Sequence, residues 1–175
     1  MPEFLHNSLG LNLTVPEVVR EIIDFMRADT ARRYRVTIGT DSELTRDNRA
    51  DFVTAVVVHR VGNGGRYFWR RGEITKMHTL RDRIIKEVLI SLDIAQEVLC
   101  ELKKFPPPAT PEQARACDGG LGLPNFDFEI HVDVGENGPT KPMIQELVGM
   151  IRAHNFEAKT KPESYAASNV ADRHV

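Results

Sequence analysis

Hydrophobic side chains recur along the chain with two different periods, and each period predicts one kind of secondary structure. Over residues 14–28 and 80–103 they recur at helical spacing. A further helical pattern covers residues 140–155, and a short alanine-rich one starts at Ser164. These patterns predict one helix near the N-terminus, one long central helix and two helices near the C-terminus.

Five other stretches are rich in Val, Ile, Phe and Thr, several with every second residue apolar, which is typical of strands. The first three follow one another closely, and Gly62-Asn63-Gly64-Gly65 is a typical hairpin connection between the second and third. The last two are separated by helical patterns, so they should join the sheet through crossover connections. The five strands are predicted at residues 36–43, 52–59, 66–72, 126–134 and 156–160.

This order of elements, α then βββ then αβαβα, predicts an α/β fold. It consists of a mixed five-stranded sheet with helices on both faces, plus the N-terminal helix. With 175 residues, we expect one domain over residues 1–175. Within it, residues 1–33 form an N-terminal helical extension. Residues 104–125 form a long loop insertion, with a short helix expected near residues 110–117.

Composition narrows the class of protein without selecting a function. The net charge is −2, so no overall field attracts nucleic acid or membranes. No apolar run is long enough to span a membrane, and the N-terminus does not resemble a signal peptide. The two cysteines, Cys100 and Cys117, form no metal or redox motif. We therefore expect a cytoplasmic protein that exists as a monomer or homodimer.

Four acidic residues stand at positions where chemistry could take place. Asp41 ends the first strand and Asp133 the fourth, Glu87 lies beside the apolar stripe of the long helix, and Asp172 lies in the last helix. If the two strands are neighbours, two carboxylates meet at one edge, which is costly unless a cation lies between them. Oxygen-only sites suit Mg²⁺ or Mn²⁺. Alternatively, Asp41 belongs to an ordinary turn and Glu87 is a solvated boundary residue.

The element order and several motifs resemble a known family. The stretches IGTDSE, FVTAVVVHR, HVDVGENGPTK and KPESYAASNVADR look like the YkuK-type bacterial family of the ribonuclease H-like superfamily. The resemblance covers about residues 34–174. It implies a metal-dependent nuclease that hydrolyses phosphodiester bonds with two cations, Mg²⁺ or Mn²⁺. It also implies that the catalytic metal ligands are Asp41, Glu87, Asp133 and Asp172.

Some residues depart from this pattern or extend it. The triplet Asp41-Ser42-Glu43 also matches the opening motif of related 3′–5′ exonucleases, in which Glu43 would be a ligand. Those enzymes carry Tyr or His four residues before the last aspartate, where this chain has Ser168. His131 shares the polar face of its strand with Asp133, so it is either a ligand or proton shuttle, or a structural histidine. No shuttle histidine is evident, which leaves a non-catalytic nucleic-acid- or protein-binding module as the alternative function.

One stretch is locally basic. Residues 60–86 contain eight Lys or Arg against two acidic residues, with Tyr67, Phe68 and Trp69 among them. Basic and aromatic side chains together are typical of surfaces that bind RNA or DNA. The other interpretation is an edge strand protected by charge. The candidate nucleic-acid-binding residues are Arg66, Arg70, Arg71 and Lys76.

Overall fold

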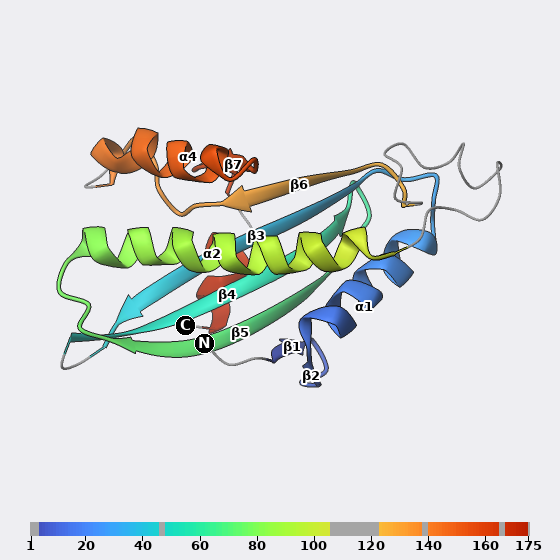
Figure 1. Ribbon diagram of the computed structural model, residues 1–175, viewed down its shortest axis with the longest axis horizontal. Helices are drawn as coiled ribbons and strands as arrows, with labels where there is room; N and C mark the ends of the chain where they lie inside the picture. The colour runs from blue at the N-terminus through green and yellow to red at the C-terminus, as the bar shows by residue number, and fades with distance from the viewer. Residues whose placement is uncertain (1–3, 46–47, 106–122, 138–139, 165–166, 175) are drawn as a thin grey trace.

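The computed structural model describes residues 4–45, 48–105, 123–137, 140–164 and 167–174 (Figure 1). Within these ranges, seven strands form a single mixed sheet in the order β2-β1-β5-β4-β3-β6-β7. The three long strands β3, β4 and β5 form an antiparallel meander, while β6 pairs parallel to β3 and β7 parallel to β6. The α/β class with a mixed sheet is therefore confirmed. The strands are β1 (Leu5–Asn7), β2 (Asn12–Leu13), β3 (Tyr34–Leu44), β4 (Arg49–Arg60), β5 (Gly65–Thr75), β6 (Phe126–His131) and β7 (Glu157–Lys159).

The prediction of five strands was too low, because a short hairpin precedes the first helix. In this hairpin β1 pairs with β2, and β1 also pairs with β5 through His6 opposite Trp69 and Asn7 opposite Phe68. Strands of three and two residues are too short to show a hydrophobic period, so no pattern marked them. The N-terminal extension at residues 1–33 therefore contains strands as well as a helix, and β1 covers part of the outer edge of β5.

Helices cover both faces of the sheet. On one face α1 (Val15–Arg27), α2 (Leu80–Lys103) and α4 (Ile144–Ala153) enclose the main core, with α2 running across the sheet in Figure 1. The side chains of successive residues of β4 point to opposite faces of the sheet, as the pleat of a strand requires. Val56 points into the main core, whereas Val53 and Ala55 pack against Ala171 on the opposite face. That face is covered by the C-terminal turns η3 (Ala167–Ala171) and η4 (Asp172–His174).

The helix boundaries agree closely with the sequence patterns. The long helix spans residues 80–103 as predicted, and the Thr79 hydroxyl caps it by accepting a 3.0 Å hydrogen bond from the Asp82 amide. The helix predicted at residues 140–155 begins as a 3-10 turn, η2 (Lys141–Met143), and continues as α4. Asn155 follows with a φ of 62°, the left-handed conformation that commonly ends a helix.

Two predicted segments differ or cannot be compared. The fourth strand was predicted to reach residue 134, but β6 ends at His131, so Asp133 lies two residues beyond the strand. Residues 106–122, which include most of the predicted loop insertion and its short helix, lie outside the described residues. Within the described ranges, no helix has both the length and the apolar character that crossing a membrane requires.

Candidate active site

Three of the four predicted carboxylates line one cleft. Asp41 comes from β3, Glu87 from α2 and Asp133 from the segment after β6, and the cleft has a volume of about 310 Å³. The parallel pairing of β6 with β3 brings the ends of these strands side by side, although they are far apart in the sequence. The cleft is also lined by Ser42, Arg83, Asn137, Thr140 and Lys161.

The opening strand and the long helix are joined by hydroxyl groups beside the cleft. Thr40 and Ser42 alternate with Asp41 along β3 and therefore face α2. The Ser91 hydroxyl donates a 2.8 Å hydrogen bond to Thr40, and the Ser42 hydroxyl donates a 2.6 Å hydrogen bond to the Glu87 carboxylate. Glu87 and Ser91 are four residues apart, so they lie on the same face of the helix. These bonds set the position of Glu87 relative to the end of β3.

Glu87 is the most strongly perturbed acid of the cleft. Its side chain is buried, with an exposed fraction of 6 %, and burial raises its pKa to about 8. The hydrogen bond from Ser42 and the charge of Arg83 oppose this rise, while the nearby charges of Asp41 and Asp133 add to it. Glu87 is therefore mostly protonated at neutral pH, chiefly because burial disfavours its charged form and secondarily because Asp41 and Asp133 lie nearby.

Two basic side chains also reach the cleft. Lys161 places its ammonium nitrogen 2.9 Å from Oδ1 of Asp133. Arg83, one turn before Glu87 on α2, donates a 2.9 Å hydrogen bond to the carbonyl oxygen of Ser42. Neither residue was assigned a role beside the carboxylates from the sequence. Arg83 could have been noticed because it lies four residues before Glu87, but nothing in the sequence connects Lys161 with Asp133.

The donor atoms of the cleft have the chemistry that Mg²⁺ or Mn²⁺ requires. Asp41, Glu87 and Asp133 provide oxygen ligands, and their mutual repulsion would be relieved by a cation. Within the described ranges, however, no three His, Cys, Asp or Glu side chains converge closely enough to hold a metal ion. Asp172 begins η4, and its side chain lies outside what the structure describes. The donor set thus fits a cation in its chemistry, and binding one would require these carboxylates to draw together and Asp133 to exchange its contact with Lys161 for the metal.

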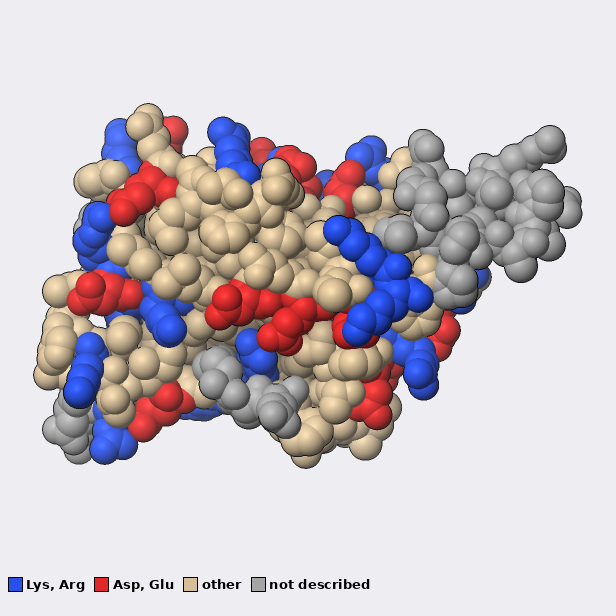
Figure 2. Space-filling view, in the orientation of Figure 1, with Lys and Arg blue, Asp and Glu red and all other residues tan. Residues whose placement is uncertain are grey.

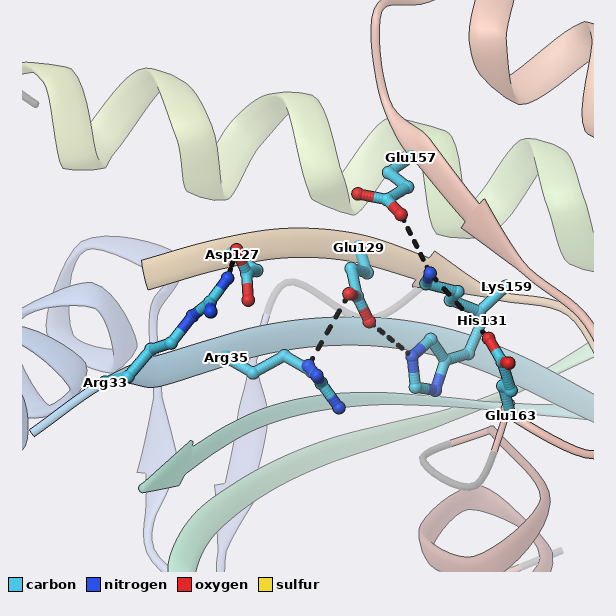
Figure 3. Close-up of polar contacts among 8 residues, drawn as sticks. All are labelled: Arg33, Arg35, Asp127, Glu129, His131, Glu157, Lys159 and Glu163. Atoms are coloured by element: carbon cyan, nitrogen blue, oxygen red, sulfur yellow. Dashed lines mark hydrogen bonds and ion pairs between the residues drawn. The ribbon is translucent and has the colours of Figure 1, made fainter. Parts of the chain in front are cut away.

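The two additional ligand candidates lie elsewhere. Glu43 is exposed near the end of β3 and is not among the residues that line the cleft. His131 is 1 % exposed, and its Nε2 lies 3.2 Å from Oε2 of Glu129 (Figure 3). Burial lowers the pKa of His131, which favours the neutral ring, although the contact with Glu129 acts in the opposite direction. Glu129 is also 3.5 Å from Nε of Arg35. The geometry therefore favours the structural interpretation of His131.

The predicted nucleic-acid-binding residues do not form one surface. Arg70 is 7 % exposed, and burial lowers its pKa, while Asp93 and Glu97 of α2 lie close enough to oppose that effect. Arg70 therefore faces α2 instead of solvent, which does not favour the prediction that it binds nucleic acid. Arg66 pairs with Glu21 of α1 at 3.5 Å.

The other two candidates point elsewhere. Arg71 faces the opposite side of the sheet from Arg70 because neighbouring residues of a strand alternate, and it pairs with Asp51. Lys76 is exposed beyond the end of β5. Two of the aromatic residues of this stretch already pack within the protein: Phe68 is buried, and the Trp69 ring stacks on His174 with 4.2 Å between ring centroids. Figure 2 shows acidic side chains mixed with basic ones over the face that carries α2.

In this chain a meander is extended into a mixed sheet by parallel strands. Carboxylates come from the first long strand, from the helix that follows the meander and from the segment after the next strand. This combination defines the ribonuclease H-like class. The comparison with known proteins agrees: a family model described as Ribonuclease H-like matches residues 17–175, and the chain belongs to this family. It is 32 % identical over 173 residues to "Uncharacterized protein YkuK" of Bacillus subtilis (strain 168), covering 96 % of this chain and 94 % of that protein. The resemblance to YkuK-type proteins is thereby confirmed. No solved structure gives a significant match.

Proposed function

We propose that this protein is an Mg²⁺- or Mn²⁺-dependent nuclease that hydrolyses phosphodiester bonds, with Asp41, Glu87, Asp133 and Asp172 as the cation ligands. One observation carries the proposal: three of these carboxylates, from three separate elements, line the same cleft in a chain of the ribonuclease H-like family. Cations bound by such groups supply an activated water and stabilise the charge that develops on the leaving oxygen.

The residues of the chain itself have separate tasks in this proposal. Ser42 holds the Glu87 side chain toward the cleft. Because burial raises the pKa of Glu87, its carboxyl group ionises at neutral pH mainly when a strong positive charge such as a cation binds beside it. Arg83 and Lys161 are the basic residues among those lining the cleft, and each can donate hydrogen bonds to phosphate oxygens. The nucleic acid therefore binds at the cleft, in place of the β5 surface predicted from the sequence. The cytoplasm remains the proposed compartment.

The test is cleavage of a labelled panel of single- and double-stranded RNA and DNA, an RNA–DNA hybrid and a branched junction in Mn²⁺. Asp41→Asn and Asp133→Asn should each reduce cleavage by about 100-fold or more. The matched control is the same substitution in β6, Asp127→Asn, because Asp127 pairs with the exposed Arg33 at 3.0 Å and is not among the residues that line the cleft. Cleavage that survives both cleft substitutions would refute the assignment.

A non-catalytic binding module is the second candidate, and two observations favour it. Lys161 already neutralises Asp133, and the histidine nearest in sequence to Asp133 is bonded to Glu129 instead of pointing into the cleft. This function predicts that members of the same panel bind without turnover, and that binding weakens as salt rises. A gel-shift measurement on the uncleaved panel separates the two candidates.

A further inference from the structure

Lys161 is held beside Asp133 by the backbone as well as by charge. The Lys161 amide donates a 2.9 Å hydrogen bond to the carbonyl oxygen of Val134, and the Val132 amide donates one of 2.9 Å to Lys159. These bonds continue the parallel alignment of β6 and β7 beyond the last residues of both strands. The segment that carries Lys161 therefore runs alongside the segment that carries Asp133, and their side chains meet in the cleft.

Gly135 leaves the room that the Lys161 side chain needs. A Cβ atom at position 135 would lie 3.2 Å from Cβ of Lys161 and 3.7 Å from its Cδ. The aliphatic stem of Lys161 thus packs in the space that a side chain at position 135 would fill. Its ammonium nitrogen lies 2.9 Å from Oδ1 of Asp133. The Lys161 side chain is 51 % exposed, so it can leave this position without disturbing the core.

We propose that Lys161 is a built-in competitor of the divalent cation at Asp133, and that it moves onto the substrate phosphate when the cation binds. This inference rests on the proposed nuclease function. An ammonium group 2.9 Å from Oδ1 of Asp133 repels a divalent cation bound to the same carboxylate and competes with it for the negative charge, so we expect the cation to displace Lys161. Lysine suits this exchange because its charge is compact and its stem flexible. The displaced ammonium stays in a cleft that receives an anionic substrate, so cation and phosphate each favour binding of the other.

The chain provides a matched control two residues earlier. Lys159 lies on β7 and pairs with Glu157 at 2.8 Å and Glu163 at 3.7 Å (Figure 3). It lines a different hollow, with Arg35 and Glu129, and is not among the residues that line the carboxylate cleft. Lys159→Met removes the same charge as Lys161→Met and keeps a similar apolar stem, without affecting the contact at Asp133.

The experiment is a calorimetric titration of Mn²⁺ into the wild-type protein and the two variants. Lys161→Met should bind Mn²⁺ about threefold to tenfold more tightly than wild type, because an exposed ion pair no longer has to be broken. Lys159→Met should bind as wild type does, and Lys161→Arg, which keeps the charge, should not show the gain. Adding thymidine 5′-monophosphate should strengthen Mn²⁺ binding more in wild type than in Lys161→Met.

Gly135→Ala tests the same inference while keeping the lysine. The added Cβ would crowd the Lys161 stem and weaken its contact with Asp133, so Mn²⁺ binding should become tighter than in wild type, by a smaller factor than in Lys161→Met. Equal or weaker binding by Lys161→Met would overturn the inference. If the wild-type protein still cleaves nucleic acid in that case, only the role of Lys161 fails. If neither the wild-type protein nor any variant binds Mn²⁺, both the role of Lys161 and the proposed nuclease function fail.

Discussion

The Ser42 hydroxyl donates a 2.6 Å hydrogen bond to the Glu87 carboxylate, and this bond joins the end of β3 to the N-terminal half of α2. Ser42 directly follows Asp41, so the bond also sets the spacing between two of the candidate ligands. Arg83 strengthens the same junction by donating to the Ser42 carbonyl oxygen at 2.9 Å. The geometry of the cleft therefore depends on a serine as much as on its acids.

Replacing Ser42 by alanine should raise the pKa of Glu87 further, because the bond from Ser42 is the main influence that lowers it. It should also cost about 1 kcal/mol of unfolding free energy. The pKa can be followed by NMR titration of the Glu87 carboxyl carbon. Ser91→Ala is the control: it removes a buried hydroxyl of the same helix, bonded to Thr40, and should leave the pKa of Glu87 in place.

The raised pKa of Glu87 makes stability depend on pH. Folding holds a proton on Glu87 that the unfolded chain releases above about pH 4.5, so this group's contribution to stability falls as pH rises from 4.5 to 8 and is constant above. Glu87→Gln removes the effect. Without divalent cations, the variant should gain about 2 kcal/mol relative to wild type between pH 6 and pH 9. Urea unfolding at both pH values measures this, and parallel pH profiles for the two proteins would contradict it.

Cation binding should release a proton from Glu87. The group is mostly protonated at pH 7, and a metal ligand must be ionised, so Mn²⁺ binding should release nearly one proton per protein molecule. Calorimetry at pH 7 in buffers with different heats of ionisation counts the protons. Glu87→Gln should release almost none. Proton release that is unchanged in this variant would assign the proton to another group.

Arg70→Glu should destabilise the fold instead of weakening nucleic-acid binding selectively. Arg70 is buried against α2, where Asp93 and Glu97 are nearby charges, so a glutamate there would be a buried acid beside two further acids. We expect a loss of about 3 kcal/mol or more in unfolding free energy, measured by denaturant titration. Lys76→Glu, an equal charge change at an exposed position, should stay within about 0.5 kcal/mol of wild type.

The fold could be predicted largely from local periodicity. The alternation of β3 and the helical stripe of α2 depend on neighbouring residues only, so the pattern identified both elements. Asp41 was predicted to end its strand, but β3 continues to Leu44, so Asp41 lies three residues before the end. The hairpin of β1 and β2 was missed because strands this short depend on their pairing, of β2 with β1 and of β1 with β5. Local pattern carries no information about such pairing.

The candidate site was predicted less completely, for a related reason. Its acids stand at the ends or margins of regular elements, which a sequence shows, but their partners are chosen by tertiary contacts. Lys161 reaches Asp133 only because β7 aligns with β6. Arg70 looked like part of a basic surface because nothing in its own stretch indicates that α2 covers it.

The parallel pairing of β6 with β3 has a consequence for folding. Asp41 and Glu87 belong to a meander and helix that are contiguous in the chain and can form from contacts between neighbouring elements. Asp133 and Lys161 arrive only when β6 and β7 add to the far side of β3. Pairing between distant segments is slow because a long loop must close first, so the cleft is completed late. A molecule that binds there recognises only the finished sheet, and its binding energy adds fully to the stability of the native state.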